Sequence, residues 1–318
     1  TAAALTAGVA VAEIDYSISG YKEFAYSSRS SQVAASHGTY MSTDSEIKFS
    51  FTNKTEDGLD IGFVTEVLTD AGDSVIDESS MSISGGFGKI VLGGNDSVMD
   101  NYGFEAEDAV TEQSSTAHTL STIQTGNGPA AAFTATDNKI IAYHLPAMGN
   151  FTAGISYSDS GVANTAANAA TDTTAYGFAY TADAGGNTIT IAGAQATTQN
   201  ATQDIEAQNI SAKAVAGNVS FIIAKTTYEA ADEGQNSTGG GVTYTMPGGM
   251  VIGAYTFSSD DSSDAGEEYR KSGVEVMYTV AAGLKAIVNI DDYDYKVGTE
   301  SSTADSGTIS KLTIQATF

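Results

Sequence analysis

The feature that most restricts the fold of this chain is an alternation of apolar and polar residues with a period of two, which recurs along nearly its whole length. "EIKFSF" places Ile47, Phe49 and Phe51 on one face of an extended segment, and "SKLTIQATF" continues the pattern to Phe318. Successive side chains of a β-strand point to opposite faces, so the alternation predicts strands with one apolar and one polar face. Helical periodicity is almost absent, and the sequence therefore predicts an all-β protein.

The connections between the expected strands alternate between two lengths. Short turns such as "NKTEDG" at 53–58 and "PGG" at 247–249 follow one end of the strands, and long polar loops follow the other. The long loops are expected at about 27–44, 69–79, 94–137, 158–173, 196–204, 229–239, 258–267 and 296–307. This spacing predicts about sixteen strands, with both termini on the side of the short turns.

Alternation of this kind is typical of a transmembrane antiparallel β-barrel with short periplasmic turns and long external loops. A bilayer offers no hydrogen bonds to an open sheet edge, so a sheet crosses it only when closed. A soluble β-sandwich also alternates, but it gives no reason for the loops to alternate in length. Aromatic residues gather beside the short turns, as an interfacial girdle requires: Phe51, Phe151, Tyr180, Phe221, Tyr244, Tyr278 and Phe318. We predict one barrel domain over residues 13–318.

Charge and composition exclude several other functions. The chain has 39 acidic and 13 basic residues, a formal net charge of −26, which argues against a general affinity for nucleic acid. It has no cysteine, so disulfides and thiolate sites are absent, and His37, His118 and His144 lack the spacing of a helical metal pair. We expect no enzyme activity. Residues 1–12, "TAAALTAGVAVA", look like the end of a secretory signal and are predicted to be a signal-peptide remnant.

Two stretches resemble a known family. "SISGGFGKIVLGGNDS" and "TATDNKIIAYHLPAMGNFTAGISYSDSG" resemble the general diffusion porins of α-proteobacteria, the Rhodobacter-type branch of the trimeric outer-membrane porins. The resemblance implies a homotrimer in the bacterial outer membrane, in contact with lipid bilayer and lipopolysaccharide, through which small hydrophilic solutes and ions diffuse passively. It also implies a third loop folded back inside the barrel, and it makes Phe318 the signal read by the outer-membrane assembly machinery. The chain departs from many porins in lacking Trp and in its extreme acidity.

The expected third loop, at 94–137, is strongly acidic. Its carboxylates are Asp96, Asp100, Glu105, Glu107, Asp108 and Glu112. Such charges are costly to bury but stable in a water-filled pore, so an inward-folded loop would place them at the constriction. A solvated acidic surface loop is the alternative. The acid excess predicts a preference for cations.

If the pore follows the family, the wall facing this loop is expected to be basic. Alternation offers Lys22, Arg29, Lys48, Lys285 and Lys311 as lumen-facing candidates, with Lys213 on the same face of its own neighbourhood. Lys22 interrupts an apolar face and requires a bulge at Gly20 to turn inward. Each of these lysines taken alone is also explained as a solvated side chain, and Arg29 as part of the first external loop.

A trimer interface requires an apolar outward face, which the early strands offer at Ile47, Ile61 and Val67 beside the loop at 69–79. The function requires no cofactor, but clustered acids offer hard oxygen ligands for calcium: Asp260, Asp261, Asp264, Asp291, Asp292 and Asp294. Simple solubilising acidity is the alternative. The competing class of protein is a secreted acidic calcium-binding β-rich adhesin or surface-layer protein, which would dissolve without detergent.

Overall fold

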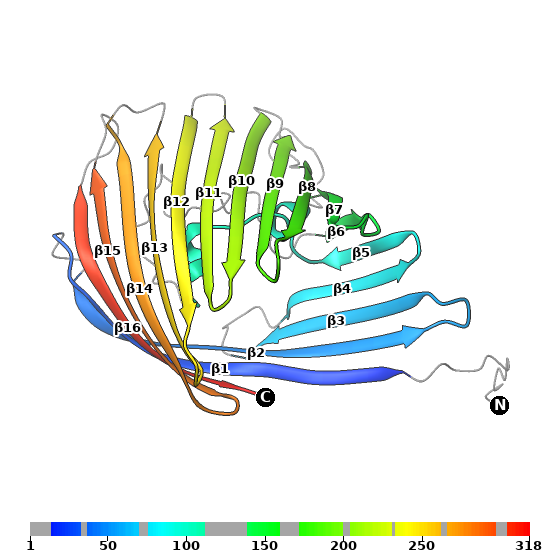
Figure 1. The fold of residues 1–318 in the computed structure, drawn as a ribbon, viewed down its shortest axis with the longest axis horizontal. Helices are drawn as coiled ribbons and strands as arrows, with labels where there is room; N and C mark the ends of the chain where they lie inside the picture. Colours follow the sequence, from blue (N-terminus) through cyan, green and yellow to red (C-terminus); the bar gives the residue numbers. More distant parts are fainter. Residues whose placement is uncertain are drawn as a thin grey trace, which may run out of the picture.

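The structure, a computed structural model, describes residues 14–32, 37–69, 76–111, 139–159, 172–199, 204–230, 233–261, 266–296 and 304–318. In these ranges the chain forms a closed antiparallel barrel of sixteen strands (Figure 1). The first eight strands are β1 (Asp15–Arg29), β2 (Gly38–Lys54), β3 (Asp60–Leu68), β4 (Ile76–Gly85), β5 (Gly88–Gly94), β6 (Lys139–His144), β7 (Phe151–Asp159) and β8 (Asp172–Asp183). The others are β9 (Thr188–Gln199), β10 (Asp204–Ala216), β11 (Val219–Ala230), β12 (Glu233–Thr245), β13 (Met250–Asp261), β14 (Glu268–Ala281), β15 (Leu284–Lys296) and β16 (Asp305–Thr317).

The described part of the connection between β5 and β6 contains two short helices. They are α1 (Val98–Asn101) and the 3-10 helix η2 (Ala106–Ala109). None of the helices in the described ranges is long and apolar enough to cross a membrane.

Each strand pairs with its neighbours in sequence, and β1 closes the barrel against β16 (Figure 1). The register of this closing pair runs from Tyr21 opposite Thr317 to Arg29 opposite Ile309. It extends to the last residue, because the Phe318 N–H donates to the Gly20 carbonyl at 3.1 Å and the Gly20 N–H donates to the Phe318 carbonyl at 3.2 Å. Closure leaves no unpaired sheet edge, as a bilayer requires.

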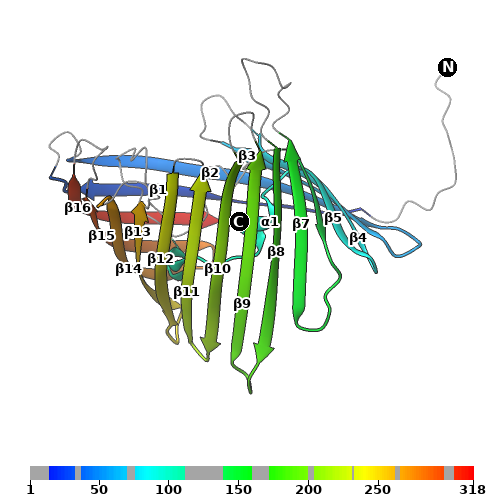
Figure 2. The same ribbon diagram turned by 90° about the horizontal axis from the view of Figure 1, so that it is seen from above.

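The alternation in the sequence divides each strand into two faces. Ile210 and Ile223 are 67% exposed on one face of β10 and β11, whereas their chain neighbours Asn209, Ser211 and Ile222 are buried. Exposed large apolar side chains recur on the same face of the other strands. This apolar face is the outer face of the barrel, and positions that alternate with it face the lumen. Figure 2 shows the barrel from a second side, with β7–β12 running side by side.

The predicted strand number is confirmed, but the alternation of short and long connections breaks at two places, and three expected long loops are mostly strand. The loop expected at 27–44 is mostly strand because β1 runs to Arg29 and β2 begins at Gly38. The loop expected at 196–204 is mostly strand, because β9 runs to Gln199 and β10 begins at Asp204. The loop expected at 229–239 is likewise mostly strand, since β11 ends at Ala230 and β12 begins at Glu233. Small and polar residues occupy both faces of these strand ends, so the period of two is not visible in the sequence there.

Candidate pore constriction

Residues 95–111, here called the acidic segment, are the described part of the connection between β5 and β6. Ser97 caps α1: its Oγ accepts from the Met99 N–H at 3.1 Å and donates to Asp100 Oδ2 at 3.3 Å. At η2 the Glu105 N–H donates to Asp108 Oδ2 at 3.0 Å within a reciprocal capping box. Two of the predicted pore acids, Asp100 and Asp108, therefore also fix the local fold of the segment.

Lumen-facing side chains of four strands bond to the backbone of the acidic segment. Ser156 on β7 accepts from the Val98 N–H at 3.0 Å, and Ser211 on β10 accepts from the Phe104 N–H at 2.9 Å. Thr243 on β12 donates to the Ala109 carbonyl at 2.9 Å. Glu275 on β14 accepts from the Thr111 N–H at 2.8 Å. The segment thus satisfies its backbone groups along an arc of the wall from β7 to β14.

Glycines on the lumen-facing side allow this close approach. A Cβ added to Gly177 on β8 would lie 2.6 Å from Cβ of Tyr102, and one added to Gly239 on β12 would lie 2.8 Å from Cβ of Ala106. A Cβ on Gly241 would collide with Ala106 and Ala109. A strand glycine often marks a place where another backbone comes near, and these glycines lie directly under the acidic segment.

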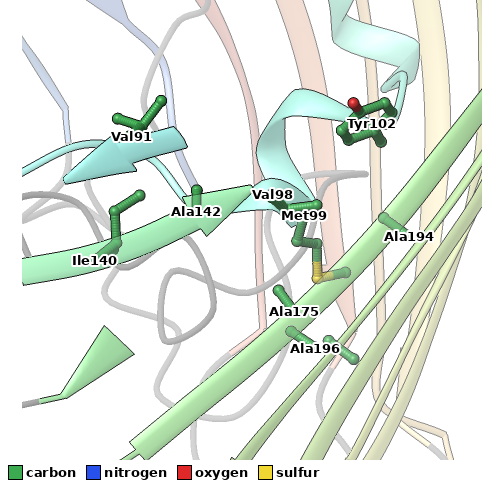
Figure 3. Packing of buried hydrophobic residues seen from close by; sticks show 10 residues of the cluster. Val91, Val98, Met99, Tyr102, Ile140, Ala142, Ala175, Ala194 and Ala196 are labelled. Carbon is green, nitrogen blue, oxygen red and sulfur yellow. The ribbon is translucent and has the colours of Figure 1, made fainter. Parts of the chain in front are cut away.

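Apolar contacts hold both helices against the wall. Val98 and Met99 of α1 are buried in a cluster with small residues of β8 and β9. Figure 3 shows Met99 pointing toward Ala175 and Ala194. Ala106 and Ala109 of η2 belong to a second buried cluster, which is mostly aromatic: Tyr255, Phe257, Tyr269, Tyr293 and Tyr295, with Ile309.

A buried ion pair joins η2 to β14. Lys271 Nζ lies 3.2 Å from Glu107 Oε1, and the two side chains are 4% and 2% exposed. The ammonium also lies 5.6 Å from the centre of the Tyr255 ring. Glu107 was predicted to line the pore; instead it is enclosed between η2 and the wall. Loss of one partner of such a pair leaves an uncompensated buried charge, at a cost of about 3–5 kcal/mol.

The other predicted acids of the segment are more open. Asp96, Asp100 and Glu105 are half-buried, and Asp108 is exposed. Glu112 lies outside the described residues.

Burial and neighbouring carboxylates raise the pKa values of three of these acids. Burial, helped by the charge of Asp96, raises the pKa of Asp100 to about 7. Burial and the charges of Asp108, Glu107 and Asp100 raise the pKa of Glu105 to about 8. The pKa of Asp96 is also raised, by burial first and then by the charges of Glu66 and Asp77. The acids of the segment therefore lie in a strongly negative environment.

The lumen-facing side of β1–β4 is acidic rather than basic, contrary to the expectation for the facing wall. The carboxylates on this side include Glu23, Asp44, Glu46, Glu66 and Glu78. Lys48 lies among them, where it forms an ion pair with Glu66. The negative charge of Glu66 thus offsets the positive charge of Lys48.

The other predicted basic residues lie on β1, β10, β15 and β16. Lys285 and Lys311 occupy lumen-facing positions of β15 and β16. Arg29 is buried, 5.9 Å from the centre of the Tyr40 ring, and Lys213 faces the lumen 5.4 Å from the centre of the Phe104 ring. Arg29 and Lys311 lie near each other across the closing strand pair, since Lys311 is opposite Ser27, two residues before Arg29.

The expected bulge at Gly20 is absent, which corrects the placement of Lys22. The pairing of β1 with β2 runs without a break from Asp15 to Arg29. Lys22 therefore stays on the outward face with Phe24 and Tyr26, where its Nζ donates to Ser45 Oγ at 3.0 Å.

The acids predicted to bind calcium do not converge as expected. Asp291 faces the lumen, is buried and accepts from the Tyr255 hydroxyl at 2.9 Å, whereas Asp292 and Asp294 lie on the opposite face of β15. Asp260 and Asp261 also point to opposite faces of β13, and Asp264 lies outside the described residues. Calcium binding stays a prediction.

A different group of carboxylates comes together on the early strands. Carboxylate oxygens of Glu46, Glu66 and Asp77 lie within 4.8 Å of one another. The Lys48 ammonium provides a positive charge at this place through its contact with Glu66.

The sequence did not indicate the wall residues that receive the acidic segment: Asn209, Ser211, Lys271 and Glu275. One signal was present in "STGGGVTY", where Gly239 and Gly241 occupy lumen-facing positions of β12. Glycine adds nothing to strand stability there, so its presence indicates that another part of the chain approaches.

A closed sixteen-strand barrel with an apolar outer face and a polar lumen defines an integral membrane channel of the outer-membrane type. The sequence matches the Gram-negative porin family over residues 1–298, and the chain belongs to this family. It is therefore an integral protein of the outer membrane. No sequence among the curated proteins matches it.

Solved structures share the fold at low sequence identity. An anion-selective porin from Comamonas acidovorans has a TM-score of 0.69 and 16% identity, over 96% of this chain and 100% of that chain. A variant of the Rh. blastica porin has a TM-score of 0.66 and 17% identity, with the same coverage. The outer-membrane protein OmpT of Vibrio cholerae has a TM-score of 0.68 and 12% identity, over 96% of this chain and 98% of that one.

Proposed function

We propose that this porin forms a water-filled channel for passive diffusion of small hydrophilic solutes and ions, that the connection at 94–137 narrows it, and that it prefers cations. The observation that carries the proposal is that carboxylates stand both on the acidic segment and on the wall of β1–β4. Asp100 and Glu105 belong to the segment, and Glu23, Glu46 and Glu78 belong to the wall. The segment's contacts with lumen-facing side chains from β7 to β14 support its role as the constriction.

Charge of one sign in a narrow lumen attracts counter-ions and repels co-ions, because the low-dielectric wall concentrates the field. Lys48 does little to oppose this field, since Glu66 is paired with it. Lys285 and Lys311 on β15 and β16 are outnumbered by the carboxylates of β1–β4 and the segment. The anion selectivity in the name of the Comamonas porin belongs to that protein, and a likeness at 16% identity concerns the fold alone.

We also propose that the protein is a homotrimer of the Rhodobacter-type branch, in contact with lipopolysaccharide and inserted by the outer-membrane assembly machinery. The outward faces of β2 and β3, with Ile47, Ile61 and Val67, supply an apolar surface for subunit contact. OmpT of Vibrio cholerae, which shares the fold, has been solved in a trimer form. We assign no residue a catalytic role.

The test is the reversal potential across a planar bilayer under a salt gradient. A triple variant, Asp100→Asn, Glu105→Gln and Asp108→Asn, should lower the cation preference even near 1 M salt when measured at about pH 9, where Asp100 and Glu105 are ionised. The Debye length there is about 3 Å, so only charges lining the narrow part of the pore still act on passing ions.

The matched control removes three outward-facing carboxylates: Asp260→Asn, Asp292→Asn and Asp294→Asn. This control should change the reversal potential only in dilute salt, where the Debye length is about 30 Å at 0.01 M. If the first triple variant matches the parent protein in molar salt, the acidic segment does not line the pore and the proposed constriction is wrong.

A further inference from the structure

We infer that the acidic segment is sealed against the wall of β12–β14 and that Lys271 is a positioning residue that holds it there. Solutes then pass on the side of the segment that faces β2 and β4, where Glu46, Lys48 and Glu78 are partly exposed. This inference rests on the proposed constriction and adds which side of the segment conducts and what holds the segment in place.

The sealing follows from burial along the contact. Ala106 and Ala109 of η2 are 0% and 2% exposed, and Tyr255 and Phe257 beneath them are 4% and 3% exposed. Backbone of the segment lies against Gly241 and Gly253, where an added Cβ would collide with carbonyl oxygens of Ala106 and Ala109. A contact this close contains no path for a hydrated ion.

Lumen-facing side chains of β2 and β4 are more exposed than those of β14. Lys48, Glu46 and Glu78, on lumen-facing positions of β2 and β4, remain partly exposed. Their counterparts Lys271 and Glu275 on β14 are 4% and 2% exposed. Water therefore reaches the lumen-facing side chains of β2–β4 and is excluded from those of β14.

The groups around Lys271 stabilise its positive charge. Glu107 accepts from its ammonium at 3.2 Å, and the Tyr255 ring lies 5.6 Å from it. Glu275 occupies the next-but-one lumen-facing position of the same strand, where it binds the Thr111 N–H. A passing ion is separated from Lys271 by η2, so this lysine fixes the segment rather than attracting or repelling solutes.

The experiment compares Lys271→Gln, Glu107→Gln and the double variant by single-channel conductance and reversal potential. Both single variants should raise conductance in the same direction, by about twofold or more, because an unpaired buried charge disfavours the docked position. The double variant restores a neutral hydrogen-bonding pair and should return conductance toward that of the parent. Lys225→Gln, an exposed outward position on β11, should leave both readings unchanged.

The role of Lys271 is decided by whether the two single variants raise the conductance together or shift the reversal potential in opposite directions. If Lys271 and Glu107 face the conducting path, the single variants will shift the reversal potential in opposite directions with little change in conductance, and the inference is overturned. These outcomes are independent of the Asp100, Glu105 and Asp108 variant. That variant can fail while the conductance pattern persists, which separates failure of the proposed selectivity from failure of the docking.

Discussion

Asp100 and Glu105 differ from surface acids because their surroundings oppose ionisation near neutral pH. The pKa of Asp100 is raised to about 7 and that of Glu105 to about 8, in both cases mainly by burial. Each is mostly neutral below its pKa, half ionised at it and mostly negative above it. The charge at the proposed constriction therefore changes within the range of ordinary measurements.

We expect the cation preference to increase as the pH rises from about 6 to about 9, as these two acids ionise. Reversal potentials measured at 1 M salt over this range would show the change. The variant Asp100→Asn with Glu105→Gln should lose most of the pH dependence. A parent channel with a flat profile would show that neither group titrates beside the conducting path.

Glu107 shows what alternation and charge in the sequence do not reveal. It lies in the same acidic run as Glu105 and Asp108, yet it is buried against Lys271, 164 residues away in the sequence. The counter-charge comes from a distant strand, and no local pattern brings the two together. The sequence therefore predicted an acidic constriction but not which of its acids lie in it.

At the scale of single strands, sequence was most informative where one face is apolar. The alternation at Ile47, Phe49 and Phe51 places these residues on the outward face of β2, as predicted. It failed near Gln199 and Glu233, where strands extend with polar residues on both faces. It also could not place Lys22, because one lysine in an apolar run is explained equally by a bulge or by an outward side chain.

The orientation of the barrel in the membrane follows from which ends of the strands carry the short turns. The turn between β14 and β15 should lie in the periplasm, and the start of β16 should lie outside the cell. Ala304→Cys should react with an impermeant thiol reagent on intact cells, and Ala282→Cys should react only after lysis. Both positions are exposed alanines, so the pair is matched in chemistry. The reverse labelling pattern would show that the barrel has the opposite orientation in the membrane.

At the scale of the whole molecule, the balance between an apolar outer face and a chain of net charge −26 determines how it can be handled. We expect it to require detergent after extraction and to migrate as a trimer on gels unless boiled. Mass measurement in mild detergent would check the subunit number. A single copy at neutral pH would contradict the trimer, and solubility without detergent would contradict membrane insertion of the protein as prepared.

The uneven burial of the lumen has a mechanical consequence. From β7 to β14 the sheet is backed by a second layer, the acidic segment, whereas the lumen-facing side chains Glu46, Lys48 and Glu78 of β2 and β4 are partly exposed. A sheet backed by packed side chains resists bending more than a single sheet, since bending would have to separate those contacts. The barrel thus has a stiff half and a compliant half. In a trimer that joins at the early strands, each subunit would stiffen the compliant half of its neighbour.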